Sequence, residues 1–422
     1  MNPEITKLKN NLQVLVTKLP NVASATTLFL VRAGSRYEQK KQNGIAHFAE
    51  HMFFKGTKKR PTALDISSTV DSVGAEFNAF TAKEFTGFYI KAASKHLPLS
   101  FDVLTDMILH SKFDQREIDR ERGVISEELR MNLDTPARYI SDFFEILLYG
   151  DHPLGWHITG TIDSLKNINR EDFISYLEQF YQPRNMVVSV SGGVGNEILK
   201  IPDQYLSDLS DKDVKNFLPV KEEQKKPAIK LMNKKTEQAH FCLGVRAYPR
   251  GHENRYKLAV LNTILGVSMS SRLFIQLRER RGLAYYVRST VEEYTDSGFF
   301  VTQVGTEPKN IQEATKVILE EFNKLSAKNV LEDELKKAKE YIKGKIVLEL
   351  EDSREVASMF GLQQLLENKI RTPEEIMENV ERVSADNVKS TASDIFRDSK
   401  LNLAIIGPYK EEGEFVKILK LS

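Results

Sequence analysis

Apolar and polar positions alternate along the first residues of the chain with the period of a β-strand. Leu12, Val14 and Val16 fall on one face at a spacing of two residues, whereas the residues between them fall on the other. After a turn at residues 19–21, an almost continuously apolar run over residues 26–31 predicts a second strand. The chain is therefore expected to begin with β-structure.

Helical periodicity dominates the next stretch. The spacing of apolar residues predicts helices over residues 44–55, 61–73, 97–109, 114–131, 137–149 and 170–180, a hairpin over 75–93 and a strand over 186–191. The first helix is expected to stop at Gly56, because a glycine after the last apolar turn commonly ends a helix. Asp114 has the position of a cap for the long helix that follows it.

A charged, proline-containing segment from Lys200 to Lys230 separates the two halves. The second half repeats the order strand, strand, helix: its pattern predicts strands over 228–231, 238–247, 283–304 and 402–406, and helices over 255–265, 271–281, 308–326, 331–349, 353–368 and 373–396. We therefore expect an α+β chain with two similar, duplicated domains, residues 1–215 and 216–422.

Composition narrows the functional classes. The formal net charge is +1, so a whole-protein basic field for nucleic acid is absent, and no nucleic-acid partner is expected. Cys242 is the single cysteine, which excludes an intramolecular disulfide and any cysteine-rich metal module. The first residues lack a secretory apolar region, and no run of 18 apolar residues occurs. The expectation is a cytoplasmic protein without a membrane segment.

The strongest chemical signal is the pentapeptide His47-Phe48-Ala49-Glu50-His51. On a helix, residues four apart lie on one face with Cβ atoms about 5–6 Å apart, so two imidazoles could share one zinc ion. Glu50 borders that face and could reach a water on the metal without being a ligand. The alternative is a chance pair, since the chain has eight histidines.

A third ligand is needed for a catalytic zinc, and a carboxylate is the expected donor. Glu121 and Glu128 lie seven residues apart on the helix that Asp114 opens, so they share a face. Val124, Ile125 and Met131 give that face a partly buried character. A glutamate-rich exposed helix is the alternative, and spacing alone does not choose between Glu127 and Glu128.

The surrounding sequence resembles the pitrilysin-type zinc metallopeptidases, the inverzincins, which carry an inverted zinc motif. The resemblance covers nearly the whole chain, and it is closest to the short, two-domain branch that includes mitochondrial processing peptidase. It rests on His47-x-x-Glu50-His51 followed 76 residues later by Glu128, and on the segments around it: Ala33-Gly34-Ser35-Arg36, Phe54-Lys55-Gly56-Thr57, Asn78-Ala79-Phe80-Thr81, Glu121-Arg122-x-Val124-Ile125, His152-Pro153-Leu154-Gly155 and Ser271-Arg272-Leu273-Phe274 through Gly282-Leu283-Ala284-Tyr285.

The resemblance implies a zinc endopeptidase whose chain forms half of a clamshell. It implies one zinc ion per chain, held by His47, His51 and Glu128, with zinc-bound water as the nucleophile. Glu50 would be the general base, and Glu121 would lie in the second shell of a zinc histidine. The substrates would be unfolded peptides or short leader or targeting segments.

The resemblance also implies roles for the second domain and for an edge strand. Arg278 and Tyr285 match a pair that contacts substrate near the scissile bond, and Asn78, Ala79 and Phe80 match a strand that pairs with extended peptide. Since this chain carries both the zinc motif and the pair, we expect a homodimer in which Arg278 and Tyr285 act on the partner chain's zinc site. Taken alone, Arg278 could be a surface charge and Tyr285 a core residue. A non-catalytic scaffold of the same fold is the competing function.

Overall fold

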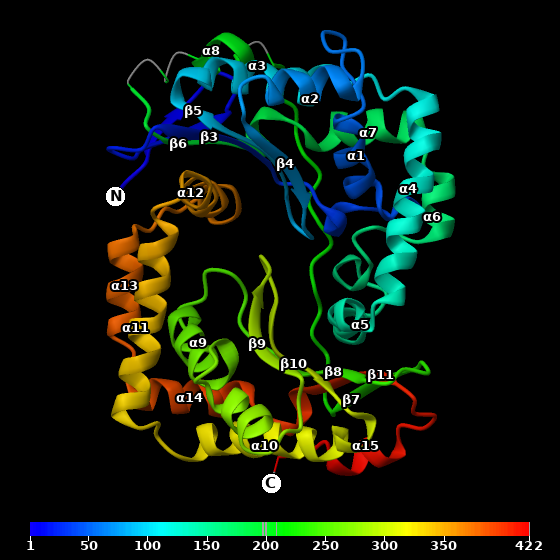
Figure 1. The fold of residues 1–422 in the computed structure, drawn as a ribbon, viewed down its shortest axis with the longest axis vertical. Helices are drawn as coiled ribbons and strands as arrows, with labels where there is room; N and C mark the ends of the chain where they lie inside the picture. Colours follow the sequence, from blue (N-terminus) through cyan, green and yellow to red (C-terminus); the bar gives the residue numbers. More distant parts are fainter. Residues whose placement is uncertain (196–197, 199–200, 208, 422) are drawn as a thin grey trace. The chain divides into compact units, whose positions relative to one another are not determined.

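The computed structural model describes residues 1–195, 198, 201–207 and 209–421. The chain forms two compact units, each built on one mixed β-sheet (Figure 1). Unit 1 comprises Met1–Arg130, Trp156–Leu218 and Val347–Pro373, and unit 2 comprises Met131–Gly155, Pro219–Ile346 and Glu374–Ser422. The α+β class with two similar units is confirmed. Because neither unit is a continuous stretch of chain, the division between residues 215 and 216 stays a prediction.

The sheet of unit 1 has six strands in the order β1-β2-β6-β3-β5-β4. Every neighbouring pair is antiparallel except β2 and β6, which run parallel. The sequence pattern did not predict the first strand. The strands are β1 (Glu4–Lys7), β2 (Gln13–Lys18), β3 (Ser24–Val31), β4 (Glu76–Thr81), β5 (Thr86–Ala93) and β6 (Met186–Gly192).

The sheet of unit 2 repeats this topology. Its order is β7-β11-β8-β10-β9, and only β7 and β11 run parallel. The strands are β7 (Ala228–Asn233), β8 (Ala239–Arg246), β9 (Tyr286–Glu293), β10 (Gly298–Thr306) and β11 (Leu401–Gly407). When β1 is set aside, the two sheets match strand for strand, including the position of the parallel pair. The predicted duplication is therefore present in the topology.

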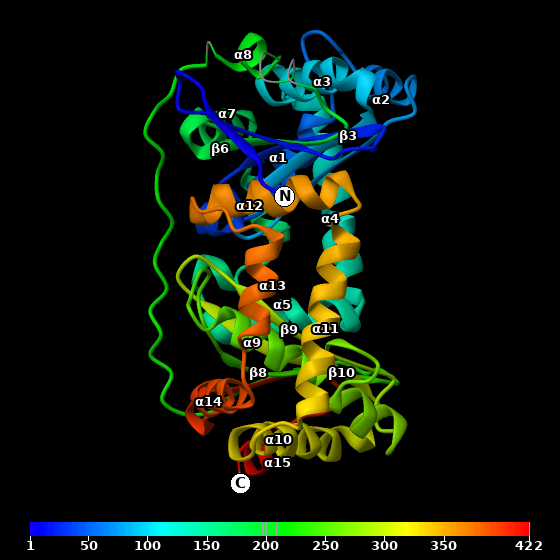
Figure 2. The same cartoon turned by 90° about the vertical axis from the view of Figure 1, so that its left-hand side faces the viewer.

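Both faces of the first sheet are buried, as β2 illustrates. Val14 and Val16 join the core under α1, α3 and α7, whereas Leu15 joins a second core under α12. Figure 2 shows α12 on the opposite side of this sheet from α3 and α7. The helices of this unit are α1 (Ile45–Phe53), α2 (Ala63–Asp71), α3 (Leu97–His110), α4 (Gln115–Asp134), α6 (Ile162–Asn167), α7 (Arg170–Phe180), α8 (Ile201–Leu206) and α12 (Ser353–Glu367). The last residues of α4 belong to unit 2.

The second sheet is also covered on both faces. Phe241 and Phe300 point into the core with α9, α10 and α14, whereas Cys242 and Val301 face α5. The helices are α5 (Pro136–Tyr149), α9 (Arg255–Asn262), α10 (Ile311–Ala327), α11 (Glu332–Glu349), α13 (Pro373–Glu381), α14 (Ala385–Ile395) and α15 (Gly413–Ile418). The two halves of the chain thus exchange helices, because α5 comes from the first half and α12 from the second.

Two local predictions are wrong, and one predicted helix extends further than expected. The predicted helix over 373–396 is two helices, because Ser384 caps α14 through a reciprocal pair of hydrogen bonds with Asn387. The helix predicted over 255–265 continues beyond α9 as a π-helical turn, Thr263–Val267. On α4, Val124 and Met131 are about half exposed, since only the side of the helix around Ile125 packs against the core.

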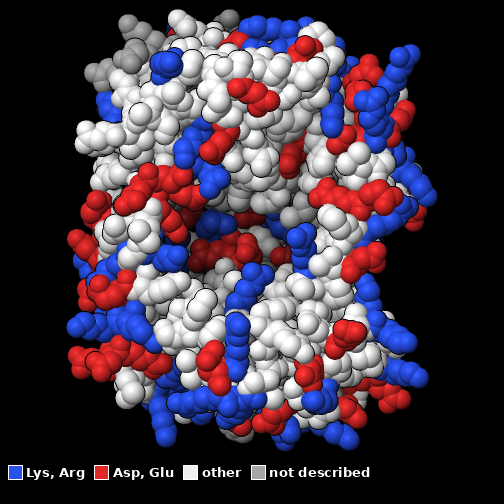
Figure 3. All heavy atoms as spheres, viewed as in Figure 1, with Lys and Arg blue, Asp and Glu red and all other residues white. Residues whose placement is uncertain are grey.

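The segment after α8 has no regular secondary structure from residue 209 to residue 227 and is drawn as an extended green trace in Figure 2. Lys200, the first residue of the charged segment identified in the sequence, lies outside the described residues. Figure 3 shows Lys and Arg intermixed with Asp and Glu over the face that it draws. Within the part of the chain that the structure describes, no helix is long and apolar enough to cross a membrane.

Candidate metal centre

Helix α1 places His47 and His51 one turn apart, with ring centroids 4.6 Å from each other. Its opposite side is fully buried through Phe48, Met52 and Phe53. Packing against the sheet and α7 therefore fixes the position of the helix, and with it the positions of the two imidazoles. This is the arrangement that the pentapeptide predicts.

The start of α1 is held by a buried carboxylate, Glu38, which belongs to the motif that resembles the family but to which the sequence assigned no role. Glu38 accepts hydrogen bonds from the backbone N–H groups of Gly44 and Ala46, at 2.8 and 2.9 Å, and from the Asn43 amide at 2.8 Å. Burial raises the pKa of Glu38 to about 7, although these three donors pull it down. Gly44 has φ of 98°, and a Cβ there would lie 2.5 Å from the Thr159 carbonyl oxygen, so only glycine fits.

Glu128 on α4 faces both histidines. Its two carboxylate oxygens lie 3.7 Å from His47 Nε2 and 3.6 Å from His51 Nε2. Three ligands bound at about 2.1 Å in tetrahedral geometry would be separated by about 3.4 Å, which is close to these distances. Among the described residues, His47, His51 and Glu128 form the only group of three or more potential metal ligands. The geometry thus selects Glu128, since Glu127 is exposed and pairs with Arg130.

Glu121 contacts His51 on the ring nitrogen that faces away from Glu128. One of its oxygens lies 2.8 Å from His51 Nδ1, and the other lies 2.7 Å from Lys55 Nζ. Burial disfavours ionisation of Glu121, but the hydrogen bonds from His51 and Lys55 outweigh it and hold its pKa below the ordinary value. An ionised Glu121 accepts the Nδ1 proton, so that Nε2 of His51 keeps its lone pair for a metal.

His47 lacks such a support. Its Nδ1 is buried, and no described residue hydrogen-bonds to it. Burial, together with His51 and His157, lowers the pKa of His47 to about 3, so the ring is neutral at physiological pH. A neutral imidazole is the form that ligates metals. The two histidines therefore differ in how they are held, and His51 is the better anchored.

Glu50 points from the same helix toward the end of β4. Its Oε2 accepts a hydrogen bond of 2.5 Å from the Thr81 hydroxyl. Burial raises the pKa of Glu50 above its ordinary value, while the Thr81 hydrogen bond and His51 oppose the shift. A raised pKa suits a carboxylate that must accept a proton and return it. Thr81 was part of the recognised motif, but the sequence offered no signal for this contact.

The strand β4 lies at the edge of its sheet, where β5 is its only pairing partner among the described residues. Asn78 is exposed, and its side-chain oxygen accepts from the Ala79 backbone N–H at 2.9 Å. Ala79 packs with the core under α1, and Phe80 packs with the core under α12. All three residues of the predicted peptide-binding strand therefore lie on the sheet edge beside the helix that carries the histidines.

Arg278 and Tyr285 both belong to unit 2. Arg278 is exposed on a π-helical turn, Phe274–Glu279, with its guanidinium over the Phe274 ring. Tyr285 is 49% exposed, and its backbone N–H donates to the Gly305 carbonyl oxygen. Tyr285 is thus available at the surface rather than buried in the core.

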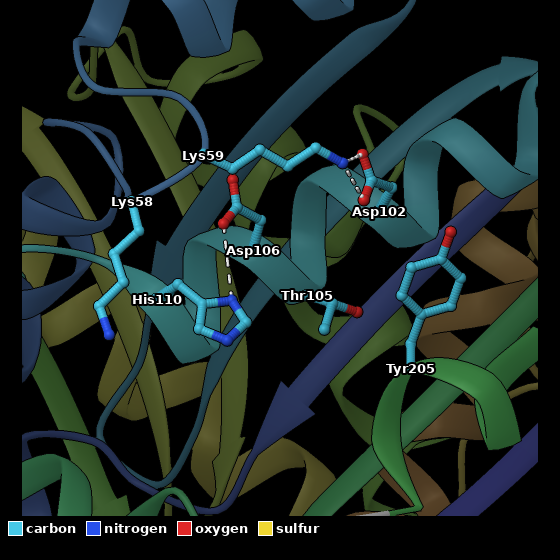
Figure 4. Close-up of a pocket in the computed structure, with 7 residues that line it drawn as sticks. All are labelled: Lys58, Lys59, Asp102, Thr105, Asp106, His110 and Tyr205. Atoms are coloured by element: carbon cyan, nitrogen blue, oxygen red, sulfur yellow. Dashed lines mark hydrogen bonds and ion pairs between the residues drawn. The ribbon is translucent and has the colours of Figure 1, made fainter.

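A separate pocket of about 340 Å³ lies between α3, α8 and the segment after α1 (Figure 4). Its acidic groups are already paired, because Asp102 bonds to Lys59 and Arg60, and Asp106 bonds to Arg60. These pairs tie the segment that leaves α1 to α3. The polar residues of this pocket therefore have a structural role, because they hold the segment that follows α1 against α3. The pocket is lined by Lys58, Lys59, Asp102, Thr105, Asp106, His110 and Tyr205.

Comparison with known proteins agrees with this centre. Residues 13–162 match the family described as Insulinase (Peptidase family M16), and residues 167–342 match the Peptidase M16 inactive domain. The chain is 36% identical to the uncharacterized zinc protease YmxG of Bacillus subtilis, over 95% of this chain and 97% of that one. It is 34% identical to an uncharacterized zinc protease of Streptomyces coelicolor, over 96% and 90%. The chain belongs to peptidase family M16.

A solved protease structure extends the match to three dimensions. A protease from Helicobacter pylori has a TM-score of 0.89 and 25% identity, covering 96% of this chain and 99% of that one. The M16 chain described here is accordingly a zinc metallopeptidase, and the metal is zinc. His47, His51 and Glu128 are the residues that can hold it, and they lie within the range that matches the insulinase family.

Proposed function

We propose that this M16 metallopeptidase is an endopeptidase that cleaves unfolded peptides or short leader or targeting segments. The observation that carries the proposal is that Glu50 lies on the same helix as His47 and His51 and accepts a hydrogen bond from Thr81 at the end of the edge strand β4. Bound zinc supplies a Lewis acid for the scissile carbonyl and lowers the pKa of water. Glu50 accepts the proton of the attacking water and passes it to the leaving amine.

The open edge of β4 supports an extended substrate. A peptide that adds to this edge pairs through its backbone, so recognition depends on an unfolded conformation more than on side chains. Asn78, Ala79 and Phe80 would form the pairing segment. A folded protein cannot present such a strand without local unfolding, which restricts the substrates to flexible segments.

We also propose that two copies of the chain enclose a chamber. Arg278 and Tyr285 are exposed donors on unit 2, and each would reach the zinc site of the partner chain. A guanidinium and a phenol are suited to stabilise a developing oxyanion. The cytoplasm is the compartment that we propose for this dimer.

The test is cleavage of a mixed pool of unstructured peptides, read by mass spectrometry. Wild type is compared with Glu50→Gln, both with measured stoichiometric zinc, because this substitution keeps the size of the side chain and removes its basicity. We expect internal cleavage by wild type and a loss of at least 100-fold in the variant. Equal cleavage by both proteins would exclude Glu50 as the base.

If neither protein cleaves while both hold zinc, the endopeptidase proposal is wrong for the isolated chain. Cleavage only at peptide ends would make the enzyme an exopeptidase. The positions of the cuts also report the side-chain preference, which the zinc ligands by themselves do not define.

A further inference from the structure

The Thr81 hydroxyl links the edge strand to Glu50. Thr81 is the last residue of β4, and period two places its side chain on the same face as Ala79, which packs under α1. From there the hydroxyl donates to Glu50 Oε2 at 2.5 Å. No other hydrogen bond from a described side chain to the Glu50 carboxylate is present, so one of its oxygens is held and the other is left for the reaction.

The backbone around Thr81 is unusually well fixed for the end of an edge strand. Thr81 pairs with Thr86 across the hairpin, and the Ala82 N–H donates to the Phe85 carbonyl at 2.8 Å. Glu84, in the same turn, forms an ion pair of 2.6 Å with Arg36, and both side chains are almost fully buried. Thr81 therefore cannot follow Glu50 if the carboxylate rotates.

The segment before α1 closes on this turn from the other side. The backbone N–H groups of Ser35 and Arg36 donate to the carbonyls of Ala82 and Lys83. Gly34 allows the approach, because a Cβ at that position would lie 2.3 Å from the Ala82 oxygen. The turn after β4 is thus held on both sides. The Thr81 hydroxyl therefore has a fixed position, and its hydrogen bond orients the Glu50 carboxylate.

We infer that Thr81 is a positioning residue for Glu50, and that it sets the carboxylate in register with a peptide added to β4. The strand that would pair with substrate and the residue that orients the base are one continuous segment, Asn78 to Thr81. A peptide that pairs with this edge would therefore have its scissile bond at a fixed position along β4 relative to the Glu50 carboxylate. This inference rests on the proposed role of Glu50 as the general base, and it adds Thr81 as the residue that orients Glu50.

Thr81→Val tests the inference, because valine keeps the shape of threonine and removes the hydroxyl. We expect kcat for an internally quenched peptide to fall about tenfold or more, with KM, zinc content and Tm within twofold or a few degrees of wild type. Thr81→Ser restores the hydroxyl and is expected to recover most of kcat. Thr86→Val is the matched control, since that hydroxyl donates to the Ala33 carbonyl and not to Glu50; its kcat should equal that of wild type.

A double-mutant comparison separates positioning from a general structural effect. In a Glu50→Asp background the carboxylate is one methylene shorter, so Thr81→Val should change kcat by less than twofold. Full kcat in Thr81→Val, failure of Thr81→Ser to recover it, or an equal loss in the Glu50→Asp background would each overturn the inference. If wild type itself is inactive, the proposed function fails first; if wild type is active and Glu50→Gln is not, only the Thr81 inference is under test.

Discussion

At the scale of single residues, the two histidines of the candidate metal centre are not equivalent. His51 is held from behind by Glu121, whereas His47 has a buried Nδ1 without a partner among the described residues. Lys55 forms an ion pair with Glu121 and, together with the His51 hydrogen bond, holds the pKa of Glu121 below its ordinary value. The strength of the metal site therefore depends on a carboxylate that does not touch the metal.

Glu121→Gln is expected to weaken zinc binding by about 10- to 100-fold, because the amide is a weaker acceptor for the His51 Nδ1 proton and leaves Lys55 without an ionic partner. Competition with a chromophoric chelator measures the affinity. The matched control is Glu127→Gln on the exposed side of the same helix. An unchanged affinity in Glu121→Gln would remove this residue from the second shell.

At the scale of elements, α1 depends on a cap that lies outside the helix. Glu38 fills the place of an N-terminal cap by accepting from two backbone N–H groups at the first turn. The Glu38 side chain is buried, and burial raises the pKa of its carboxyl group to about 7. The helix that carries the zinc ligands is thus coupled to protonation near neutral pH.

The sign of this coupling can be tested with Glu38→Gln. The pKa of Glu38 is higher in the folded protein than in the unfolded chain, so its contribution to stability is present below pH 4.5 and is lost as the pH rises to about 7. From pH 5 to pH 8, wild type should lose up to about 3 kcal/mol of unfolding free energy relative to Glu38→Gln. Urea unfolding at both pH values measures the difference, and a constant difference would contradict the assignment.

At the scale of the whole molecule, the duplicated units have diverged in chemistry while keeping their topology. Unit 1 carries the metal ligands, and unit 2 carries Arg278 and Tyr285 on its surface. Helices α5 and α12 cross between the two halves of the sequence, so each unit needs both halves to complete its core. We therefore expect neither half of the chain to fold alone.

Subunit complementation tests the proposed sharing of sites. Glu50→Gln and Arg278→Ala homodimers should each be nearly inactive, but exchange of subunits creates heterodimers with one intact site. At equal amounts, half of the dimers are mixed, so about a quarter of wild-type activity should return. If Arg278 acts on the zinc site of its own chain, or if the chain works as a monomer, mixing restores nothing.

The sequence by itself predicted most of the elements and the two histidines that share a face of α1. Short-range rules suffice there, because residues four apart on a helix share a face, as His47 and His51 do, and alternating positions such as Val14 and Leu15 separate onto two faces of a strand. The choice of Glu128 over Glu127 required the family resemblance, since both lie on the same helix and the distance to α1 is not encoded in local spacing.

Only the tertiary structure decided which distant groups meet. The Glu38 cap, the Thr81 contact to Glu50 and the exchange of α5 and α12 each join segments that no local period relates. Such contacts arise when two separately packed elements are brought together by the sheet. Their residues are ordinary polar or apolar positions in the sequence, and they become functional or structural partners through the core that surrounds them.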